Sequence, residues 1–109
     1  MIIKLKPTPL AEVKAAKLAQ LEQARDAETV KDVSALGTTW QADERSQKLL
    51  SAAITLATVG APLPPVWRDA DNNDLTITEI AQLVAIAGAM AVQTQAAYTK
   101  SWALKAQVN

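Results

Sequence analysis

The sequence predicts a mainly α-helical fold of three helices with a small β element. Two observations support this prediction. Apolar residues recur at spacings of three and four in three stretches of the chain. Short runs of β-branched residues and turn formers separate those stretches. The chain has 109 residues, which is the size of one domain. We therefore expect a single domain over residues 1–109, with residues 1–7 as an extended arm.

The first helix is expected over residues 9–26. Thr8 is a suitable N-cap, and proline is tolerated in the first helical turn. One face of this segment carries the apolar residues Leu10, Val13, Leu18 and Leu21. The following residues 29–41 are rich in β-branched side chains. They predict one or two short strands with Gly37 at a turn.

The second helix is expected over residues 44–59, because signals for both of its ends are present. Asp43 is a suitable N-cap, since its carboxylate can accept a hydrogen bond from a backbone N–H of the first turn. Gly60 stands where many helices end in the left-handed conformation, and Pro62 follows. We assign Asp43 a structural role, that of fixing the entry of this helix.

A short hairpin is expected near residues 66–77. Two β-type runs, residues 66–68 and 75–77, flank a turn that is rich in Asp and Asn. A two-stranded hairpin is marginally stable alone, so it must pack on helices or gain another strand. Trp67 lies in the first run, and together with Trp40 it is expected to cover the open end of a small helical core.

The turn of this hairpin also matches part of a calcium-binding loop. Asp69, Asp71 and Asn73 stand at the first three ligand positions of an EF-hand loop. That loop needs glycine at position six and glutamate at position twelve, where this chain has Asp74 and Ile80. The alternative is a turn whose side chains bond their own backbone, with Asp71 in a structural role. We therefore expect no metal site and no cofactor.

The third helix is expected over residues 78–107, about 29 residues or ~43 Å. It begins at Thr78, or at Thr76 with Glu79 closing a capping box. A compact chain of this size has a radius of gyration of only ~13 Å, so the helix should project beyond its core. Its apolar and small residues follow a heptad register: Ile80, Leu83, Ala87, Met90, Thr94, Ala97, Ser101, Leu104 and Val108.

Two interpretations of this long helix remain open. Its heptad face packs on the first two helices of the same chain, or its distal half packs on another subunit or partner. The candidate interface residues are Met90, Tyr98, Trp102, Leu104 and Val108. Gly88 is expected at a close helix crossing, where a leucine would destabilise the fold by ~1–3 kcal/mol through overpacking.

The composition excludes most catalytic chemistry. The chain has no cysteine and no histidine, which removes cysteine nucleophiles, histidine triads and the commonest ligands of transition metals. Its three glycines are isolated, so it has no phosphate-binding loop. The remaining acid–base candidates are Asp43 with Glu44, and Asp69 with Asp71 or Asp74. Acidic neighbours of this kind are commonplace in caps and turns, so we expect no enzymatic activity.

Charge and hydropathy limit the partners. Eleven basic residues balance eleven acidic ones, which disfavours a nucleic-acid binder. The most apolar stretch, residues 80–92, is shorter than the ~20 residues of a spanning helix, so we expect no membrane segment. Half of the residues are hydrophobic, but most of these are alanine and other aliphatics. Such a core buries little area per residue, which favours a chain that gains surface from a partner.

Four motifs together resemble a known family. They are LAEVKAAK at residues 10–17, QADERSQ at 41–47, VWRDADNN at 66–73, and LTIT at 75–78 leading into a long alanine-rich helix. In this order they are similar to a small domain of unknown function found in tailed-phage and prophage proteins, among them tail fibre and tail fibre assembly proteins. The similarity spans roughly residues 8–107.

The resemblance implies a bacteriophage tail or tail-fibre-associated protein that acts by protein–protein contact. Such a protein would serve as a virion structural subunit or as a fibre assembly helper, in the virion tail or in the host cytoplasm during assembly. The implied partners are tail or tail-fibre proteins, and we expect a homo-oligomer. The resemblance brings no catalytic residue. The alternatives are a small carboxylate-based lytic enzyme and a phage regulatory protein.

Overall fold

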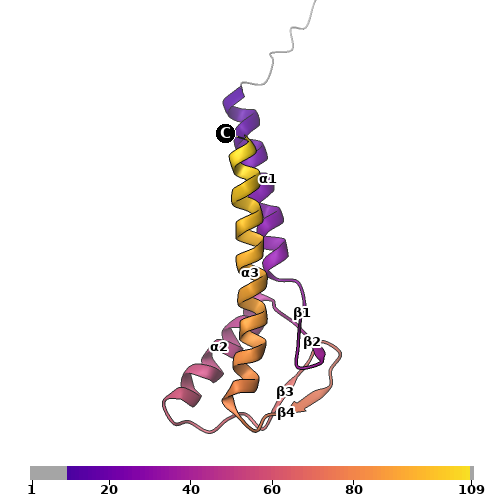
Figure 1. Ribbon diagram of the computed structural model, residues 1–109, viewed down its shortest axis with the longest axis vertical. Coiled ribbons are helices and arrows are strands. Elements are labelled where there is room, and N and C mark those ends of the chain that lie inside the picture. The colour runs from indigo at the N-terminus through magenta and orange to yellow at the C-terminus, as the bar shows by residue number, and fades with distance from the viewer. Residues whose placement is uncertain (1–9, 109) are drawn as a thin grey trace, which may run out of the picture.

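Two long antiparallel helices form a stalk, and a broader base lies at one end of it (Figure 1). The structure is a computed structural model that describes residues 10–108, so the expected arm and Thr8 lie outside the described residues. The elements are α1 (Leu10–Thr29), β1 (Val33–Ala35), β2 (Thr38–Trp40), α2 (Glu44–Thr58), β3 (Val66–Arg68), β4 (Asp74–Thr76) and α3 (Ile80–Val108). The predicted mainly α-helical class with a small β element is confirmed.

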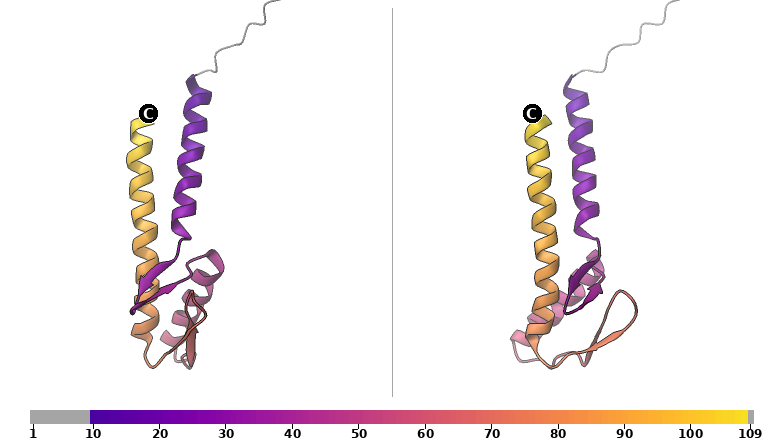
Figure 2. Two further views of the ribbon diagram at one scale, coloured as in Figure 1. Left: turned by 90° about the vertical axis from the view of Figure 1, so that its right-hand side faces the viewer. Right: turned by 45° about the vertical axis from the view of Figure 1, so that its right-hand side comes forward.

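We call α1 together with residues 94–108 of α3 the stalk, and the hairpins, α2 and residues 80–93 of α3 the base. Figure 2 shows that α1 runs beside the second half of α3, while α2 and the hairpins gather around the first half of α3. The described start of α1 and the end of α3 therefore lie together at the far end of the stalk (Figure 1).

Helix α1 ends at Thr29, three residues later than predicted. Its last turn is held by local polar contacts that the apolar periodicity does not show. The Thr29 hydroxyl donates to the backbone oxygen of Asp26 at 2.7 Å. The Lys31 ammonium bonds the Glu28 carboxylate at 2.7 Å, just past the helix end. No residue of α1 is buried.

Residues 29–41, which were expected to hold one or two short strands, contain both β1 and β2, and these pair as a hairpin with Val33 opposite Trp40. Leu36 and Gly37 make the turn, with φ angles of 54° and 78°. Positive φ at both central residues is typical of the tight turns that fit the twist of a hairpin, and glycine adopts it without steric cost. The Trp40 indole N–H donates to the Ala35 oxygen at 2.9 Å, which fixes the ring beneath the hairpin.

Helix α2 has the predicted boundaries to within one residue. The Asp43 carboxylate accepts a hydrogen bond from the Ser46 backbone N–H at 2.9 Å, which confirms the N-cap. Gly60 has a φ of 96°, and the Ala61 N–H donates back to the Leu56 oxygen at 3.0 Å. The glycine therefore ends the helix in the way that the sequence predicts.

Strands β3 and β4 pair antiparallel, with Trp67 opposite Leu75, as predicted for residues 66–77. This hairpin is attached to the first one. The Ala70 backbone N–H donates to the Thr39 oxygen at 2.9 Å, and the Thr38 hydroxyl donates to the Asp69 carboxylate at 2.8 Å. The two hairpins thus stabilise each other across the base, as an isolated hairpin could not.

Helix α3 begins at Ile80, two residues later than predicted, and the predicted capping box of Thr76 and Glu79 does not form. Gln82 takes that role instead. Its side-chain oxygen accepts from the backbone N–H groups of Thr78, at 2.6 Å, and Glu79, at 3.1 Å. An amide side chain in the first turn that reaches back to preceding N–H groups satisfies donors that the helix leaves unpaired.

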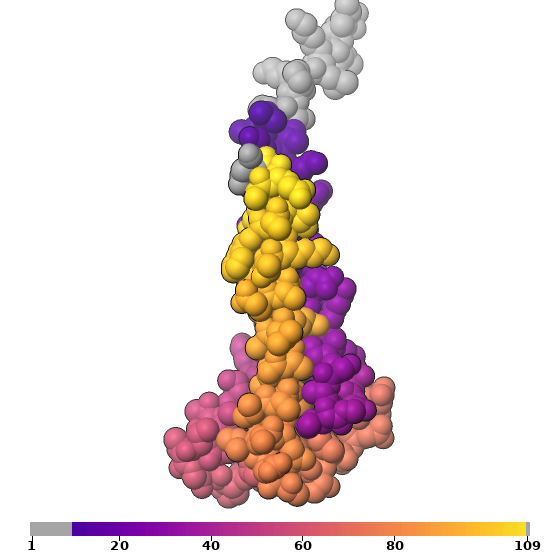
Figure 3. All heavy atoms as spheres, viewed as in Figure 1, coloured from indigo at the N-terminus to yellow at the C-terminus, as the bar shows by residue number. Residues whose placement is uncertain are grey.

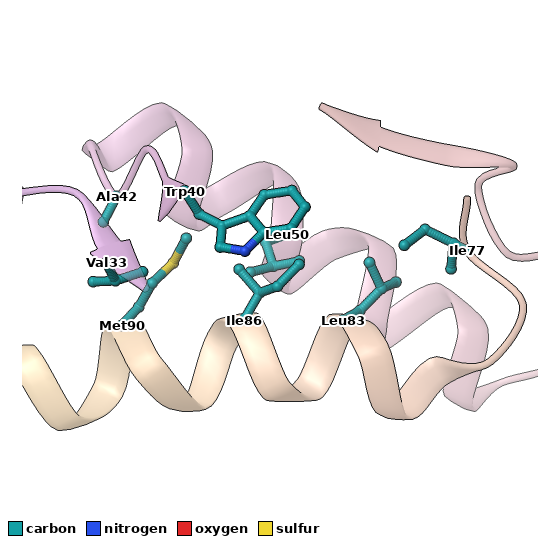
Figure 4. Close-up of a cluster of buried hydrophobic side chains, with 8 residues drawn as sticks. All are labelled: Val33, Trp40, Ala42, Leu50, Ile77, Leu83, Ile86 and Met90. Atoms are coloured by element: carbon teal, nitrogen blue, oxygen red, sulfur yellow. The ribbon is translucent and has the colours of Figure 1, made fainter. Parts of the chain in front are cut away.

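The main hydrophobic core lies in the base. It is a cluster made of Val33, Trp40, Ala42, Leu50, Ile77, Leu83, Ile86 and Met90. Figure 4 shows that Leu83, Ile86 and Met90 project from one side of α3 toward Trp40, Leu50 and the hairpins. Trp40 is only 1% exposed and is the largest side chain of this cluster.

All nine heptad positions predicted on α3 are buried or half-buried. In the base they face the core, and in the stalk they face α1, which packs along α3. The interpretation that this face packs within the chain is therefore confirmed. Packing of the distal half on another subunit stays a prediction.

Candidate protein interaction surface

An open groove runs between α1 and the distal part of α3. Its volume is about 680 Å³. Apolar side chains from both helices line it, namely Leu10, Val13, Leu21, Ala24, Leu104 and Val108. Lys14 and Lys17 of α1 and Gln107 of α3 add polar groups. We call this feature the stalk groove. It lies at the end of the molecule farthest from the core.

The other flank of the helix pair is closed by polar and aromatic contacts. The Lys105 ammonium lies 3.0 Å from the Glu22 carboxylate, which joins α3 to α1. The Arg25 guanidinium lies 4.6 Å from the centre of the Tyr98 ring, a cation–π geometry. Tyr98 in turn meets Trp102 edge-on, with ring centres 5.9 Å apart. One flank of the stalk is therefore closed by side-chain contacts between the helices, and the other flank is open and apolar.

The predicted interface residues fall into three places. Leu104 and Val108 line the stalk groove. Tyr98 is half-buried on the closed flank, and Trp102 beside it is 55% exposed. Met90 is not accessible to a partner, because its side chain is 6% exposed and belongs to the base core. The heptad period alone does not show that hairpin β1–β2 and α2 cover the proximal half of α3.

Of the residues expected to be structural, Trp40 lies inside the core rather than over an open end. Trp67 is half-buried and packs against that core from β3. Asp71 is exposed, and it contributes only its backbone N–H to the turn. The residue that organises the turn is Asp69, which is 8% exposed. Its place at the start of an Asp- and Asn-rich turn is the sequence signal that identifies it.

Gly88 does not lie at a helix crossing within the chain, so that prediction is wrong. A Cβ built on this glycine would meet nothing within 4 Å outside its own helix. Gly88 faces away from the heptad face that α1 and the base cover, and it is exposed. A leucine at this position therefore fits the single chain without overpacking.

Three carboxylates have a pKa below the ordinary value. The Lys31 side chain lowers the pKa of Glu28, whereas Asp43 and Asp69 are bound by backbone N–H groups. The Asn73 N–H, followed by the Thr38 hydroxyl and the Asp71 N–H, holds the pKa of Asp69 down against the opposing effect of burial. Hydrogen bonds from Ser46 lower the pKa of Asp43. These bonds show that the alternative interpretation of the turn, with side chains bonded to their own backbone, is correct for Asp69.

A family model for a domain of unknown function, DUF4376, matches residues 12–109. The chain belongs to the DUF4376 family. No curated protein and no solved structure matches the chain. The DUF4376 match covers the base and nearly the whole stalk, so both belong to one family unit. Membership of a family of unknown function is confirmed, and the association with phage tails stays a prediction.

The DUF4376 chain brings no three His, Cys, Asp or Glu side chains together within residues 10–108 in a way that could hold a metal ion. The carboxylates of Asp43 and Asp69, both considered as acid–base candidates, accept hydrogen bonds from nearby N–H and O–H groups. These side chains hold a helix end and a turn.

Helix α3 of this DUF4376 protein is long and apolar enough to cross a membrane, by length and composition alone. The expectation based on residues 80–92 considered only the most apolar part of it. The helix also supplies Leu83, Ile86 and Met90 to the base core, as core helices of water-soluble proteins do. Much of its remaining surface is apolar and exposed, including Val84, Val92 and Trp102.

Proposed function

We propose that this chain is a bacteriophage tail or tail-fibre-associated protein that acts by protein–protein contact. It serves as a virion structural subunit or as a fibre assembly helper, in the virion tail or in the host cytoplasm during assembly. The observation that carries the contact role is the stalk groove, which is open, apolar and remote from the core. The phage context rests on the four motifs in residues 10–78 and the long helix that follows them.

The stalk groove fits a partner segment with a defined character. Leu10 is 69% exposed at its open end, and Leu104 and Val108 face it from α3. A partner that covers these side chains gains ~25 cal/mol for each Å² of apolar surface removed from water. Lys14 and Lys17 favour acidic groups beside that apolar surface. We therefore expect an amphipathic helix with an acidic flank, which binds as a third helix along the groove.

The test is co-expression of the chain with a tail fibre protein from the same genome, followed by capture on an affinity tag. We expect the fibre protein to be retained. Retention should fall at least tenfold in the double variant Val13→Glu, Leu104→Glu, which places two charges in the groove. Val59→Glu is the matched control, because Val59 is exposed in the base and lies outside the groove.

Two outcomes would contradict the proposal. One is a failure of the unmodified chain to retain the fibre protein, and the other is equal retention by the groove variant. Mass spectrometry of purified virions separates the two roles. A virion subunit is present in the mature particle, whereas an assembly helper is found only with the fibre protein before assembly.

A further inference from the structure

Helix α1 is connected to the base by residues 30–32 alone, which we call the joint. The chain passes there from the end of α1 at Thr29 to the start of β1 at Val33. Helix α3, in contrast, runs without a break from the base into the stalk. On the face shown in Figure 3, the described part of the stalk consists of α1 and α3, and α2 and the hairpins lie at its other end. Of the two stalk helices, therefore, only α1 can move as a unit while the base stays folded.

Two glutamine side chains of the base hold the joint. Helix α1 has no basic residue in its last turn and no positive-φ residue after it, so its last carbonyl groups take partners from other elements. The Gln47 side-chain N–H of α2 donates to the Thr29 oxygen at 3.2 Å and to the Ala42 oxygen at 2.6 Å. The Gln93 side-chain N–H of α3 donates to the Lys31 oxygen at 2.6 Å. These two amides fix the direction in which α1 leaves the base.

Beyond the joint, α1 is held against α3 by weak contacts. None of its residues is buried. The Lys105–Glu22 ion pair is partly exposed, and such pairs contribute little to stability. The Ser101 hydroxyl lies buried between the two helices, without a hydrogen-bond partner among residues 10–108. Because this hydroxyl is hydrated once α1 moves away, its burial favours release of the helix.

We infer that α1 is a hinged arm, which leaves α3 by rotation about the joint while the base stays folded. The base can remain intact because none of the residues of its core cluster comes from α1. The released arm then frays, since most of the stability of a protein helix comes from the packing of its apolar face. Docking and release of the arm thus form a local equilibrium that is separate from unfolding of the base.

The arm regulates the stalk groove, an inference that rests on the proposed function. Helix α1 supplies most of the groove lining, and its Leu10, Val13 and Leu21 lie across from Leu104 and Val108 of α3. Release of α1 removes this wall, so only the docked arm offers the groove to a partner helix. A partner that binds the docked state alone also stabilises that state. The bound partner therefore closes the arm on α3.

Hydrogen exchange of the full chain in low concentrations of urea tests the arm without a partner. Amides of residues 12–27 should exchange at least tenfold faster than those of residues 83–93, through an opening that depends little on urea. Gln93→Ala should speed the exchange of α1 at least threefold. Gln95→Ala is the matched control, because the Gln95 side chain bonds Thr99 of its own helix. Exchange of arm and base with one rate and one urea dependence overturns the inference, and so does an equal effect of the two variants.

Ser101→Ala tests the docked state from the other direction. It should slow the exchange of α1 at least threefold, because the docked helices then bury no unpaired hydroxyl. Ser51→Ala, on the exposed face of α2, should leave the exchange of α1 unaltered. Unchanged or faster exchange in Ser101→Ala would count against the hinged arm.

The regulation is tested in the complex with the tail fibre protein. Bound fibre protein should slow the exchange of α1 at least tenfold. Retention of the fibre protein without slower exchange of α1 would refute the arm as a regulator of the groove. Failure of the unmodified chain to retain the fibre protein would refute the proposed function and the regulation with it, whereas the arm itself is judged by the exchange of the free chain.

Discussion

The base and the stalk are parts of one chain, but different forces hold them. In the base, two hairpins, α2 and α3 converge on a cluster of eight buried hydrophobic residues around Trp40. In the stalk, α1 has no buried residue, and α3 buries only Ala97 and Ser101 among residues 94–108. The base therefore contains the core that specifies the fold. The stalk is a helix pair whose apolar surface is only partly covered.

Helix α3 connects the two regions and shows the difference within one element. Its proximal half contributes the large core residues Leu83, Ile86 and Met90. Its distal half presents small residues to α1. Two further interactions join the helices, a cation–π contact between Tyr98 and Arg25 and a salt bridge between Lys105 and Glu22. Paired helices with little buried area open more readily than a packed core. Three sets of substitutions and one pH dependence test how far the two regions differ in stability.

The largest effect is expected from a truncation in the base core. Leu83→Ala should lower the free energy of unfolding by about 3 kcal/mol, because Leu83 is fully buried and the truncation leaves a cavity. The matched truncation in the stalk, Leu18→Ala, should lower it by about 1 kcal/mol, because Leu18 is only half-buried. Urea denaturation measures both. Equal effects would show that the stalk is as much a core as the base.

Tyr98→Ala should have the largest effect within the stalk, about 2 kcal/mol of unfolding free energy. Tyr98 is half-buried, and its removal takes away the edge contact to Trp102 and the surface on which Arg25 lies. Its neighbour Trp102 provides the control, since Trp102→Ala should lower the stability of the monomer by less than about 1 kcal/mol. Thermal melts of dilute protein, where association is negligible, give both values. A larger effect for Trp102→Ala would indicate that it packs within the chain.

Ser101→Ala should stabilise the stalk by about 1 kcal/mol. The Ser101 hydroxyl is buried and has no hydrogen-bond partner among residues 10–108, so its removal relieves a desolvation cost. Part of the gain comes from the higher helix propensity of alanine. Ser51→Ala on the exposed face of α2 measures that part, about 0.4 kcal/mol. An equal gain at both positions would show that the Ser101 hydroxyl carries no desolvation cost.

The smallest expected effect is the dependence of stability on pH that comes from Asp69. Its pKa is lowered in the folded state, first by the Asn73 N–H, so its ionised form favours folding. This contribution is present in full above the unfolded pKa of about 3.9, and it is lost as the pH falls through the lowered folded value. Thermal melts should therefore show a steeper loss of Tm below about pH 4 in the natural chain than in Asp69→Asn. Parallel curves would show that Asp69 ionises alike in both states.

Much of the fold follows from local sequence signals. Asp43 and Gly60 mark both ends of α2 because capping chemistry is local, and Gly37 marks a turn because the turn needs positive φ. The start of α3 was misplaced for the opposite reason. Gln82 reaches back from inside the helix to bond Thr78 and Glu79, and apolar periodicity does not detect such a contact.

The candidate site could be predicted only in part, because it depends on which helix faces the rest of the chain covers. The heptad period identified the face of α3 that packs internally, and Leu104 and Val108 do line the stalk groove. The period could not show that Met90 would be enclosed by β1 and α2, or that Gly88 would face outward. Both depend on where distant segments lie, which no local signal records.

The antiparallel arrangement of the stalk also determines how the molecule responds to mechanical load. Leu10 and Val108 line the same groove at the far end of the stalk. Tension applied through these two points would peel α1 from α3 turn by turn, instead of shearing the whole pair at once. Each step would break only a few contacts, so the stalk should yield at low force and extend gradually. The base, at the opposite end, would bear the load last.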